Sequence, residues 1–305
     1  MRPTLRQMQY LVAIAETGKF GDAAKRANVS QPSLSAQIAD METQLGTILV
    51  ERGRHGAFLT PLGEEAVKRA RRVLRDVEDM KAFLQSGGAS LAGRVRLGVL
   101  PTVGPYLLPA VTRQLHVEYP DLRLSVREER TIDLEAHLHD GQLDTVISSV
   151  EDHSDADHMP LFEESLWICA APDDPLAQSA GDVRLTDLSG RALLTLGYGH
   201  RLNLTIQSIA EASGAHVSAE YEGTSLDAIR QMAEMGAGVA VFPSLYAMTE
   251  ARRDPDLVVR RIDDPLARRE ISLIWRHTSP LADRLPRLAE EFKTAASTIL
   301  LGRIN

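Results

Sequence analysis

The 305-residue chain contains one cysteine, Cys169, and no apolar run that approaches the length of about 18 residues typical of a membrane-spanning helix. A single thiol excludes an intramolecular disulfide and a zinc site built on several thiolates. Its position in the apolar run LWICAAP favours core packing. The first residues, MRPTLRQMQY, lack the apolar core of a signal peptide. We therefore expect a cytoplasmic protein that does not contact a membrane.

Basic residues are in the minority, and they are unevenly distributed. The chain has 34 Lys and Arg residues against 42 Asp and Glu residues, a net charge of −8. Residues 1–75 nevertheless carry a net charge of +5, which leaves −13 for the remainder. The acidic total therefore conceals a basic N-terminal segment, and this segment is where nucleic-acid phosphates would be bound.

Residues 20–46 show the pattern of two short helices joined by a tight turn. Ala23 and Ala24 place small side chains on the first helix, which allows the second helix to cross close by. Ser30 can cap the second helix, and Pro32 fits its first turn, where a missing N–H costs little. The pattern predicts a helix-turn-helix. A helical hairpin with solvated polar residues is the alternative interpretation.

The second of these helices has an apolar stripe with polar residues beside it. In a major groove, a glutamine amide can pair bidentately with adenine, and a serine hydroxyl can bind a base or a phosphate. The polar residues that lie off the stripe are Gln31, Ser33, Ser35 and Gln37. The run ILVERGRHGAFLTPLG then predicts two short strands around a basic turn, which is a β-wing.

A long helix is predicted after Thr60, which can cap it, and Pro61, which suits its first position. Its apolar residues alternate at spacings of four and three, the pattern of a coiled-coil seam that pairs with a sister helix. A packed surface helix is the alternative. A paired helix would hold two helix-turn-helix units together on two half-sites. The seam consists of Ala66, Ala70, Val73, Val77, Met80 and Leu84.

From Arg94 the chain alternates strands with helices, which predicts a parallel α/β architecture. Two such sets occur in succession, and the last stretch, EISLIWRH followed by a helix from Pro280 to Leu301, is expected to return to the first set. The predicted divisions are a winged helix-turn-helix over 1–60, a linker (dimerisation) helix over 61–86, a hinge over 87–93, and a domain over 94–305 with one lobe over about 94–163 and 267–305 and another over about 164–266.

Segments in both halves of the chain resemble a known family. AAKRANVSQPSLSAQIADMETQLG and VERGRHGAFLTPLGE resemble the DNA-binding half of LysR-type transcriptional regulators. The second half is similar to the OxyR branch through LGVLPTVGPYLLP, the Gly199–His200 pair and EGTSLDAIRQMAEMGAGVAVFP. The resemblance covers essentially the whole chain. It places Gln31, Pro32, Ser33 and Ser35 at DNA bases, and Arg52 and Arg54 at backbone phosphate or in the minor groove.

The resemblance implies an α/β fold with a winged helix-turn-helix, a linker helix and a two-lobed, periplasmic-binding-protein-like effector domain. It also implies a homodimer or homotetramer that binds promoter DNA, with RNA polymerase as a further candidate partner, and a signal received in the cleft between the lobes. Peroxide-sensing members have a reactive cysteine directly after the Gly-His pair and its partner nine residues later. Here Arg201 and Ala210 occupy those positions, and neither side chain supports thiolate chemistry.

The residue types predict what binds in the cleft instead. Arg201 follows a strand of the second lobe, and its guanidinium matches a carboxylate bidentately, so we expect a small organic acid. Hydroxyls at the ends of strands and the starts of helices would complete the site. A solvated Arg201 and a structural His200 are the alternative. The expected effector-binding residues are Thr102, Val103, Thr131, Ser148, His200, Arg201, Thr224 and Ser225.

Other signals are weaker, and we expect no cofactor and no bound metal. GYG at 197–199 lacks the third glycine of a dinucleotide loop. EDHSDADH at 151–158 has the composition of a solvated turn, and His137 and His139 point about 200° apart on a helix. The prediction is a regulator without catalytic activity. The alternatives are a redox-responsive regulator that uses Cys169 or the methionines, and a two-lobed transferase-type enzyme, for which no nucleophile–base pair is evident.

Overall fold

The structure is a computed structural model that describes residues 3–53, 56–85, 91–220, 223, 225–254 and 257–301. The chain divides into two compact units. Residues 1–89 form most of the first unit, and residues 90–139 and 143–305 form the second. Among the described residues, no helix combines the length and apolar character needed to cross a membrane.

Three short helices form the core of the first unit: α1 (Leu5–Thr17), α2 (Phe20–Arg26) and α3 (Gln31–Leu45). The predicted cap of α3 is confirmed, because the Ser30 hydroxyl accepts a hydrogen bond from the Ser33 amide at 3.3 Å and a proline occupies the first turn. Leu34 and Ile38 on the apolar stripe of α3 are buried, together with Ala23 and Ala24 of α2. The sequence pattern thus placed the helix-turn-helix correctly.

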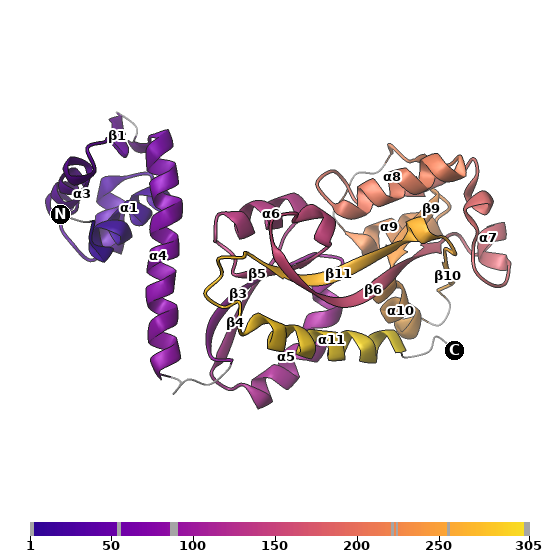
Figure 1. Cartoon of the computed structure of the whole chain (residues 1–305). Coiled ribbons are helices and arrows are strands. Elements are labelled where there is room, and N and C mark those ends of the chain that lie inside the picture. Colours follow the sequence, from indigo (N-terminus) through magenta and orange to yellow (C-terminus); the bar gives the residue numbers. More distant parts are fainter. Residues whose placement is uncertain are drawn as a thin grey trace. The chain divides into compact units, whose positions relative to one another are not determined.

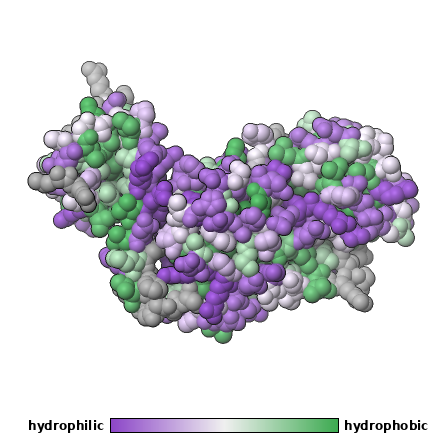
Figure 2. Space-filling model, viewed as in Figure 1, coloured by the Kyte–Doolittle hydropathy of each residue, from purple (hydrophilic) through white to green (hydrophobic). Residues whose placement is uncertain are grey.

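A hairpin and a long helix complete the first unit. Strands β1 (Val50–Gly53) and β2 (Gly56–Leu59) pair antiparallel, as predicted for the wing. Helix α4 (Pro61–Gln85) begins where the Thr60 hydroxyl accepts a hydrogen bond from the Gly63 amide at 3.0 Å. Its seam residue Ala70 is buried, whereas Val73, Met80 and Leu84 are 38%, 55% and 68% exposed. Hydrophobic residues therefore reach the surface over the C-terminal half of α4 (Figure 2).

The second unit is built on one long mixed sheet with the order β4-β3-β5-β11-β6-β9-β7-β8, and β10 pairs with β6. The pairs β3–β4, β3–β5, β7–β8 and β7–β9 are parallel, which confirms the α/β prediction. Helices or helical turns connect many of the strands. The strand bounds are β3 (Gly93–Val99), β4 (Leu122–Glu128), β5 (Thr145–Ser148), β6 (Asp157–Cys169), β7 (Ala192–Leu194), β8 (His216–Val217), β9 (Val239–Pro243), β10 (Val259–Arg261) and β11 (Arg268–Trp275).

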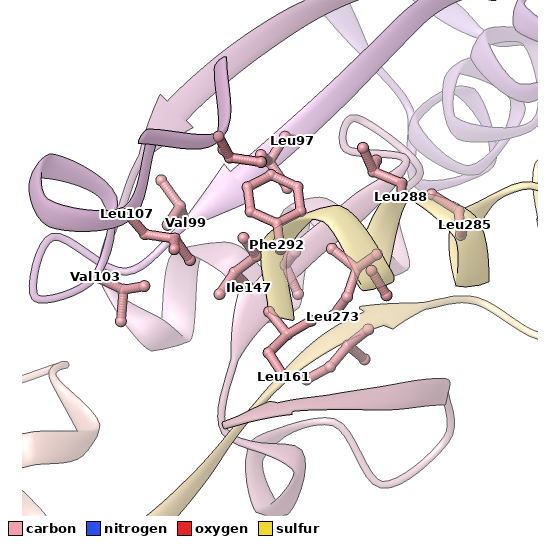
Figure 3. Close-up of a cluster of buried hydrophobic side chains, with 14 of the residues drawn as sticks. Leu97, Val99, Val103, Leu107, Ile147, Leu161, Leu273, Leu285, Leu288 and Phe292 are labelled. Carbon is pink, nitrogen blue, oxygen red and sulfur yellow. The ribbon is translucent and has the colours of Figure 1, made fainter. Parts of the chain in front are cut away.

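Two separate hydrophobic cores define two lobes within the second unit. The first lobe packs around Phe292 and includes Leu97, Ile147 and Leu273 (Figure 3). The second lobe packs around Phe242. Strands β6 and β11 are long antiparallel partners that run from one lobe toward the other (Figure 1). The remaining elements are α5 (Gly104–Glu118), α6 (Thr131–His139), η1 (Val150–Asp152), α7 (Pro175–Gln178), η2 (Leu185–Leu188), α8 (Arg201–Ser213), α9 (Leu226–Glu234), α10 (Ser244–Arg253), η3 (Pro265–Ala267) and α11 (Leu285–Leu301).

The start of one helix differs from the sequence prediction. Helix α11 begins at Leu285 rather than at Pro280, because residues 279–284 form turns in which the Ser279 hydroxyl accepts a hydrogen bond from the Leu281 amide. Helix α5 begins at Gly104, and Thr102 lies in the turn that precedes it, which is closed by bonds from the Val103 and Gly104 amides to the Leu100 carbonyl. Polar turn chemistry therefore explains the later start of α11.

Candidate functional site

The first turns of α3 present the polar residues predicted to contact DNA. Gln31, Pro32, Ser33 and Gln37 are exposed, and Ser35 is half-buried. The backbone of β1 includes Arg52, but its side chain and the whole of Arg54 lie outside the described residues. The α3 residues therefore share the accessible N-terminal part of one helix, while the arginines of the wing remain a prediction.

In the second unit, the carboxyl ends of β3, β4 and β5 meet at one edge of the sheet. The Glu129 amide donates to the Val99 carbonyl at 3.2 Å, and the Leu100 amide donates to the Ile147 carbonyl at 3.3 Å. The predicted residues Thr102, Thr131 and Ser148 all follow or end these strands. Such an edge is where ligands of open α/β sheets gather.

Arg201 joins this edge from the second lobe. It is the first residue of α8, and its backbone amide donates to the Thr131 hydroxyl at 3.1 Å. Its side-chain Nη1 donates to Oδ1 of Asp152 at 2.9 Å. The structure thus brings two predicted residues, Thr131 and Arg201, into direct contact. It also shows that the Arg201 guanidinium holds an internal carboxylate, which the sequence analysis missed.

The interpretation of residues 151–158 as a solvated turn holds for Ser154 and Asp155, which are exposed, but is wrong for Asp152 and His153 near the start of the run. Val150–Asp152 forms the 3₁₀ turn η1, which follows β5 directly, and His153 is only 5% exposed. Among the described residues, no group of His, Cys, Asp and Glu has the arrangement of a metal site. The loop composition hid the burial, because burial here depends on packing against α6 and β11, which the local sequence does not encode.

Thr102 belongs to a second polar cluster. Its hydroxyl accepts a hydrogen bond from Nη2 of Arg269 at 3.2 Å. Arg269 also donates from Nε and Nη2 to Oε2 of Glu164 at 2.8 and 2.6 Å, and the two charged side chains are 6% and 0% exposed. Burial raises the pKa of Glu164, and Arg269 opposes the shift. Glu164 and Arg269 were missed by the sequence analysis, since they lie 105 residues apart on β6 and β11.

Several buried polar atoms near these segments have no hydrogen-bond partner within the described part of the chain. Buried polar groups in proteins are normally hydrogen-bonded, so such atoms are candidate contacts for a small polar molecule. His200, the residue before α8, is 4% exposed, and burial, helped by nearby Arg130, lowers its pKa. These atoms are Oγ of Ser148 and Ser149, Oδ2 of Asp152, Nε2 of His153, Oγ1 of Thr195 and Nε2 of His200.

Other predicted residues play structural parts or stay untested. The Ser225 hydroxyl caps α9 by accepting a hydrogen bond from the Ala228 amide at 3.4 Å, and Thr224 lies outside the described residues. Val103 is fully buried in the first core. Cys169 is 1% exposed, and burial raises its pKa to about 12. A thiol that stays protonated at neutral pH is a poor nucleophile for peroxide.

The buried imidazole of His153 makes stability depend on pH. Burial lowers the pKa of His153 from 6.5 to about 4, so the unfolded chain binds the proton more tightly and stability falls as the pH drops below 6.5. By pH 5 this group should cost about 2 kcal/mol of unfolding free energy. We expect urea unfolding at pH 7.5 and 5.0 to show that loss in the wild type and a smaller loss in His153→Gln. The exposed His116→Gln variant should behave as the wild type, and an unchanged pH dependence in His153→Gln would contradict this assignment.

Comparison with known proteins decides the family. Residues 5–64 match the bacterial regulatory helix-turn-helix protein, lysR family, and residues 88–297 match the LysR substrate binding domain. The chain belongs to the LysR family. The DNA-binding transcriptional dual regulator OxyR of Escherichia coli is 37% identical over 290 residues, which cover 95% of this chain and 94% of that protein. The relatives are transcription regulators, which agrees with the expected absence of an enzymatic role.

Solved structures of LysR-family proteins resemble the whole chain. A cysteine-to-aspartate variant of full-length OxyR from Pseudomonas aeruginosa is 31% identical with a TM-score of 0.74, and the match covers 99% of each chain. A cysteine-to-serine mutant of Corynebacterium glutamicum OxyR with bound hydrogen peroxide is 29% identical with a TM-score of 0.65, covering 98% of this chain and 94% of the other. This LysR-family protein is a DNA-binding transcriptional regulator with a two-lobed α/β substrate-binding domain. It has a single cysteine in its sequence.

Proposed function

We propose that this LysR-family regulator binds promoter DNA through α3 and is controlled by a small anionic effector held between the two lobes beside Arg201. The observation that carries the proposal is the position of the Arg201 guanidinium. It lies at a contact between the lobes and already bonds a carboxylate there, that of Asp152. Arg201 is therefore a cation in the right place and geometry to recognise an acid group.

Neighbouring groups support a compact polar effector. The Thr131 hydroxyl bonds the Arg201 amide and fixes the start of α8. Buried Nε2 of His200 and buried Oγ of Ser148 have no hydrogen-bond partner among the residues described, so both are available for a ligand. Together they offer one cation, a hydroxyl and an imidazole, which suits a small carboxylate that carries a further polar group.

The proposed switch is a shift between two arrangements of the lobes. A ligand moves such an equilibrium only through its different affinity for the two states. An acid that bonds Arg201 from the second lobe and a hydroxyl from the first lobe favours one arrangement. In an oligomer held together through the exposed seam of α4, a homodimer or homotetramer, the change would alter the spacing of the DNA-binding units and thus the DNA site they fit. RNA polymerase would then be a further partner on the promoter.

The decisive experiment is a thermal-shift screen of the full-length protein against small mono- and dicarboxylic acids. A binding acid should stabilise the protein as the logarithm of its concentration. Arg201→Ala should then weaken the binding of that acid by about 2 to 4 kcal/mol, because a desolvated carboxylate loses its partner. Arg201→Lys should restore part of the affinity, since it keeps the charge without the bidentate geometry.

The matched control is Arg184→Ala, which removes an exposed arginine of the second lobe that pairs with Asp187. It should leave the response to the acid unchanged. If no acid stabilises the wild type, or if Arg201→Ala responds with the same affinity as the wild type, the anionic-effector proposal is wrong.

DNA recognition by α3 leads to a separate prediction. Gln31→Ala should weaken specific promoter binding by about 1 to 3 kcal/mol and leave binding to random DNA nearly unchanged, as expected for a base contact. Thr43→Ala at the other end of α3 is the control and should affect neither. Fluorescence anisotropy with promoter and scrambled duplexes at matched salt measures both affinities. Equal losses of Gln31→Ala on the two duplexes would show that the residue does not read bases.

A redox response is the second candidate, because several relatives, including one from Dickeya chrysanthemi at 36% identity, are hydrogen peroxide-inducible genes activators. Any such response here would proceed without a cysteine pair. Hydrogen peroxide at low dose should therefore leave the DNA footprint of the purified protein unchanged. A peroxide-dependent footprint that persists in Cys169→Ser would instead support peroxide bound noncovalently near Thr102 and His200, or oxidation of methionine.

A further inference from the structure

The ion pair between Asp152 and Arg201 connects the two lobes. Asp152 ends η1 on the first lobe, and Arg201 begins α8 on the second. The side chains are 14% and 31% exposed, so the pair is largely shielded from solvent screening. It joins segments 49 residues apart in the sequence. The contact is therefore positioned to hold the lobes in one arrangement.

The bond to Arg201 leaves Asp152 only partly satisfied. Oδ1 accepts from Arg201, whereas Oδ2 is buried and lacks a hydrogen-bond partner among the described residues. An ionised carboxylate has about four acceptor positions, and a buried one that uses few of them is poorly compensated for its desolvation. Burial accordingly raises the pKa of Asp152, and Arg201 opposes the shift. Asp152 would gain hydration if it left Arg201.

Resting on the function proposed above, we propose that Asp152 is an internal substitute for the effector: it occupies Arg201 in the effector-free protein, and a ligand carboxylate takes its place. The exchange conserves the bond that Arg201 needs, because one carboxylate replaces another. It also releases η1, which directly follows β5, and β5 pairs with β11. The backbone bond from Arg201 to Thr131 does not involve the guanidinium, so the start of α8 stays anchored during the exchange.

This arrangement makes Asp152 a specificity-determining residue. A neutral molecule cannot compete with a carboxylate for a guanidinium, so the ligand class is restricted to carboxylates and similar oxyanions. The competition with Asp152 also raises the ligand concentration needed for binding, because part of the binding free energy is used to displace Asp152. Removing its charge should therefore tighten ligand binding rather than weaken it, which distinguishes it from an ordinary ligand-contacting residue.

The effector-free state can be tested by measuring the distance between spin labels on Lys293→Cys in α11 and Thr186→Cys in η2, in a Cys169→Ala background. Both labelled positions are exposed, one on each lobe. Asp152→Asn and Arg201→Gln should each shift or broaden the distance distribution, and the double variant should resemble the single ones, because both remove the same contact. Asp182→Asn is the matched control, since it breaks the exposed Arg261–Asp182 pair within the second lobe. An unchanged distribution in both single variants would overturn the proposal.

The exchange is tested with malonate as the probe, at constant ionic strength against chloride. The malonate dissociation constant fitted to the concentration dependence of the thermal shift should be about tenfold lower in Asp152→Asn than in the wild type, a difference of ~1.4 kcal/mol, and Arg201→Gln should not respond. Equal dissociation constants in the wild type and Asp152→Asn would overturn the exchange while leaving the anionic effector intact. A response that persists in Arg201→Gln would overturn both proposals. Asp152→Glu, which keeps the carboxylate, should bind malonate with an affinity closer to that of the wild type. This variant is used if Asp152→Asn folds poorly.

Discussion

Replacing Glu164 with alanine is expected to reduce the unfolding free energy of the second unit by about 3 to 5 kcal/mol, the usual cost of leaving a buried charge without its partner. Arg269 is 6% exposed and directs both Nε and Nη2 to one oxygen of Glu164. With that oxygen removed, the Thr102 hydroxyl is the remaining bond that the structure records for the Arg269 side chain. One hydroxyl dipole compensates a buried guanidinium poorly.

Urea unfolding followed by circular dichroism measures the effect. The double variant Glu164→Leu with Arg269→Met should recover most of the loss, because two apolar side chains of similar volume avoid the desolvation of both charges. Arg184→Ala, which removes the 77% exposed partner of Asp187, is the matched control and should lie within experimental error of the wild type. A single variant as stable as the wild type would show that the pair is not buried in solution.

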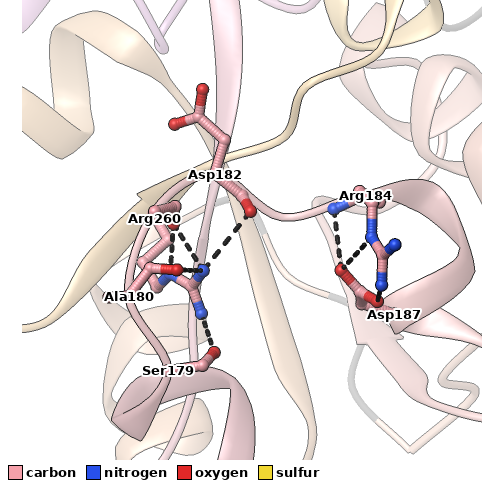
Figure 4. A network of polar contacts seen from close by, with 7 residues as sticks. Ser179, Ala180, Asp182, Arg184, Asp187 and Arg260 are labelled. Carbon is pink, nitrogen blue, oxygen red and sulfur yellow. Dashed lines mark hydrogen bonds and ion pairs between the residues drawn. The ribbon is translucent and has the colours of Figure 1, made fainter.

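The second large effect is expected at Arg260, a 9% exposed residue of β10. Its guanidinium donates to backbone carbonyls rather than to a carboxylate: Nη1 bonds the Leu176 carbonyl at 2.6 Å, Nε bonds the Gly181 carbonyl at 2.6 Å, and Nη2 bonds the Ala180 carbonyl at 3.0 Å. Nη1 also donates to the Ser179 hydroxyl (Figure 4). One side chain thus holds the segment that follows α7 against β10.

Arg260→Ala should destabilise the second unit by about 3 to 5 kcal/mol, because the carbonyls of Leu176, Ala180 and Gly181 lose a largely buried charged donor at once. Arg260→Lys should recover only part, since an ammonium cannot match donors that lie in the plane of a guanidinium. Limited proteolysis should show faster cleavage near residues 176–182 in both variants. The neighbouring Arg261→Ala, which removes an exposed pair with Asp182, is the control. Cleavage elsewhere, or equal stability of Arg260→Ala and the control, would contradict the role of Arg260 in holding the segment after α7 against β10.

Local patterns were sufficient where local chemistry decides the structure. The caps by Ser30 and Thr60 and the strand–helix alternation after Arg94 are written in short stretches of sequence, and the structure confirms them. Most of the fold was predictable for this reason. Contacts between distant segments were not predictable, and the Glu164–Arg269 pair shows why: each charged residue stands in its own strand and is explained only by the antiparallel register that joins β6 to β11.

The candidate site shows the same division between local features, which were predictable, and contacts between distant segments, which were not. Hydroxyls at strand ends and Arg201 at the start of α8 followed from element order, and the structure places Thr131 beside Arg201. Asp152 was overlooked because its neighbours are polar, and a polar run indicates solvent unless tertiary packing covers it. That these residues bind an effector is a prediction, which the thermal-shift experiments above test.

The continuity of β6 and β11 limits how the lobes can move. These strands pair along Arg268–Trp275, and β6 continues into pairing with β9 and β10 in the second lobe. A wide hinge opening would tear this ladder of hydrogen bonds, whereas a change of twist preserves it. The register shifts between Ile271 and Ser272, and such irregularities increase local twist. The β6–β11 pair therefore permits the second lobe to rotate by a change of strand twist. A signal at Arg201 would then reach the first lobe as a rotation of the second lobe about the strand axis.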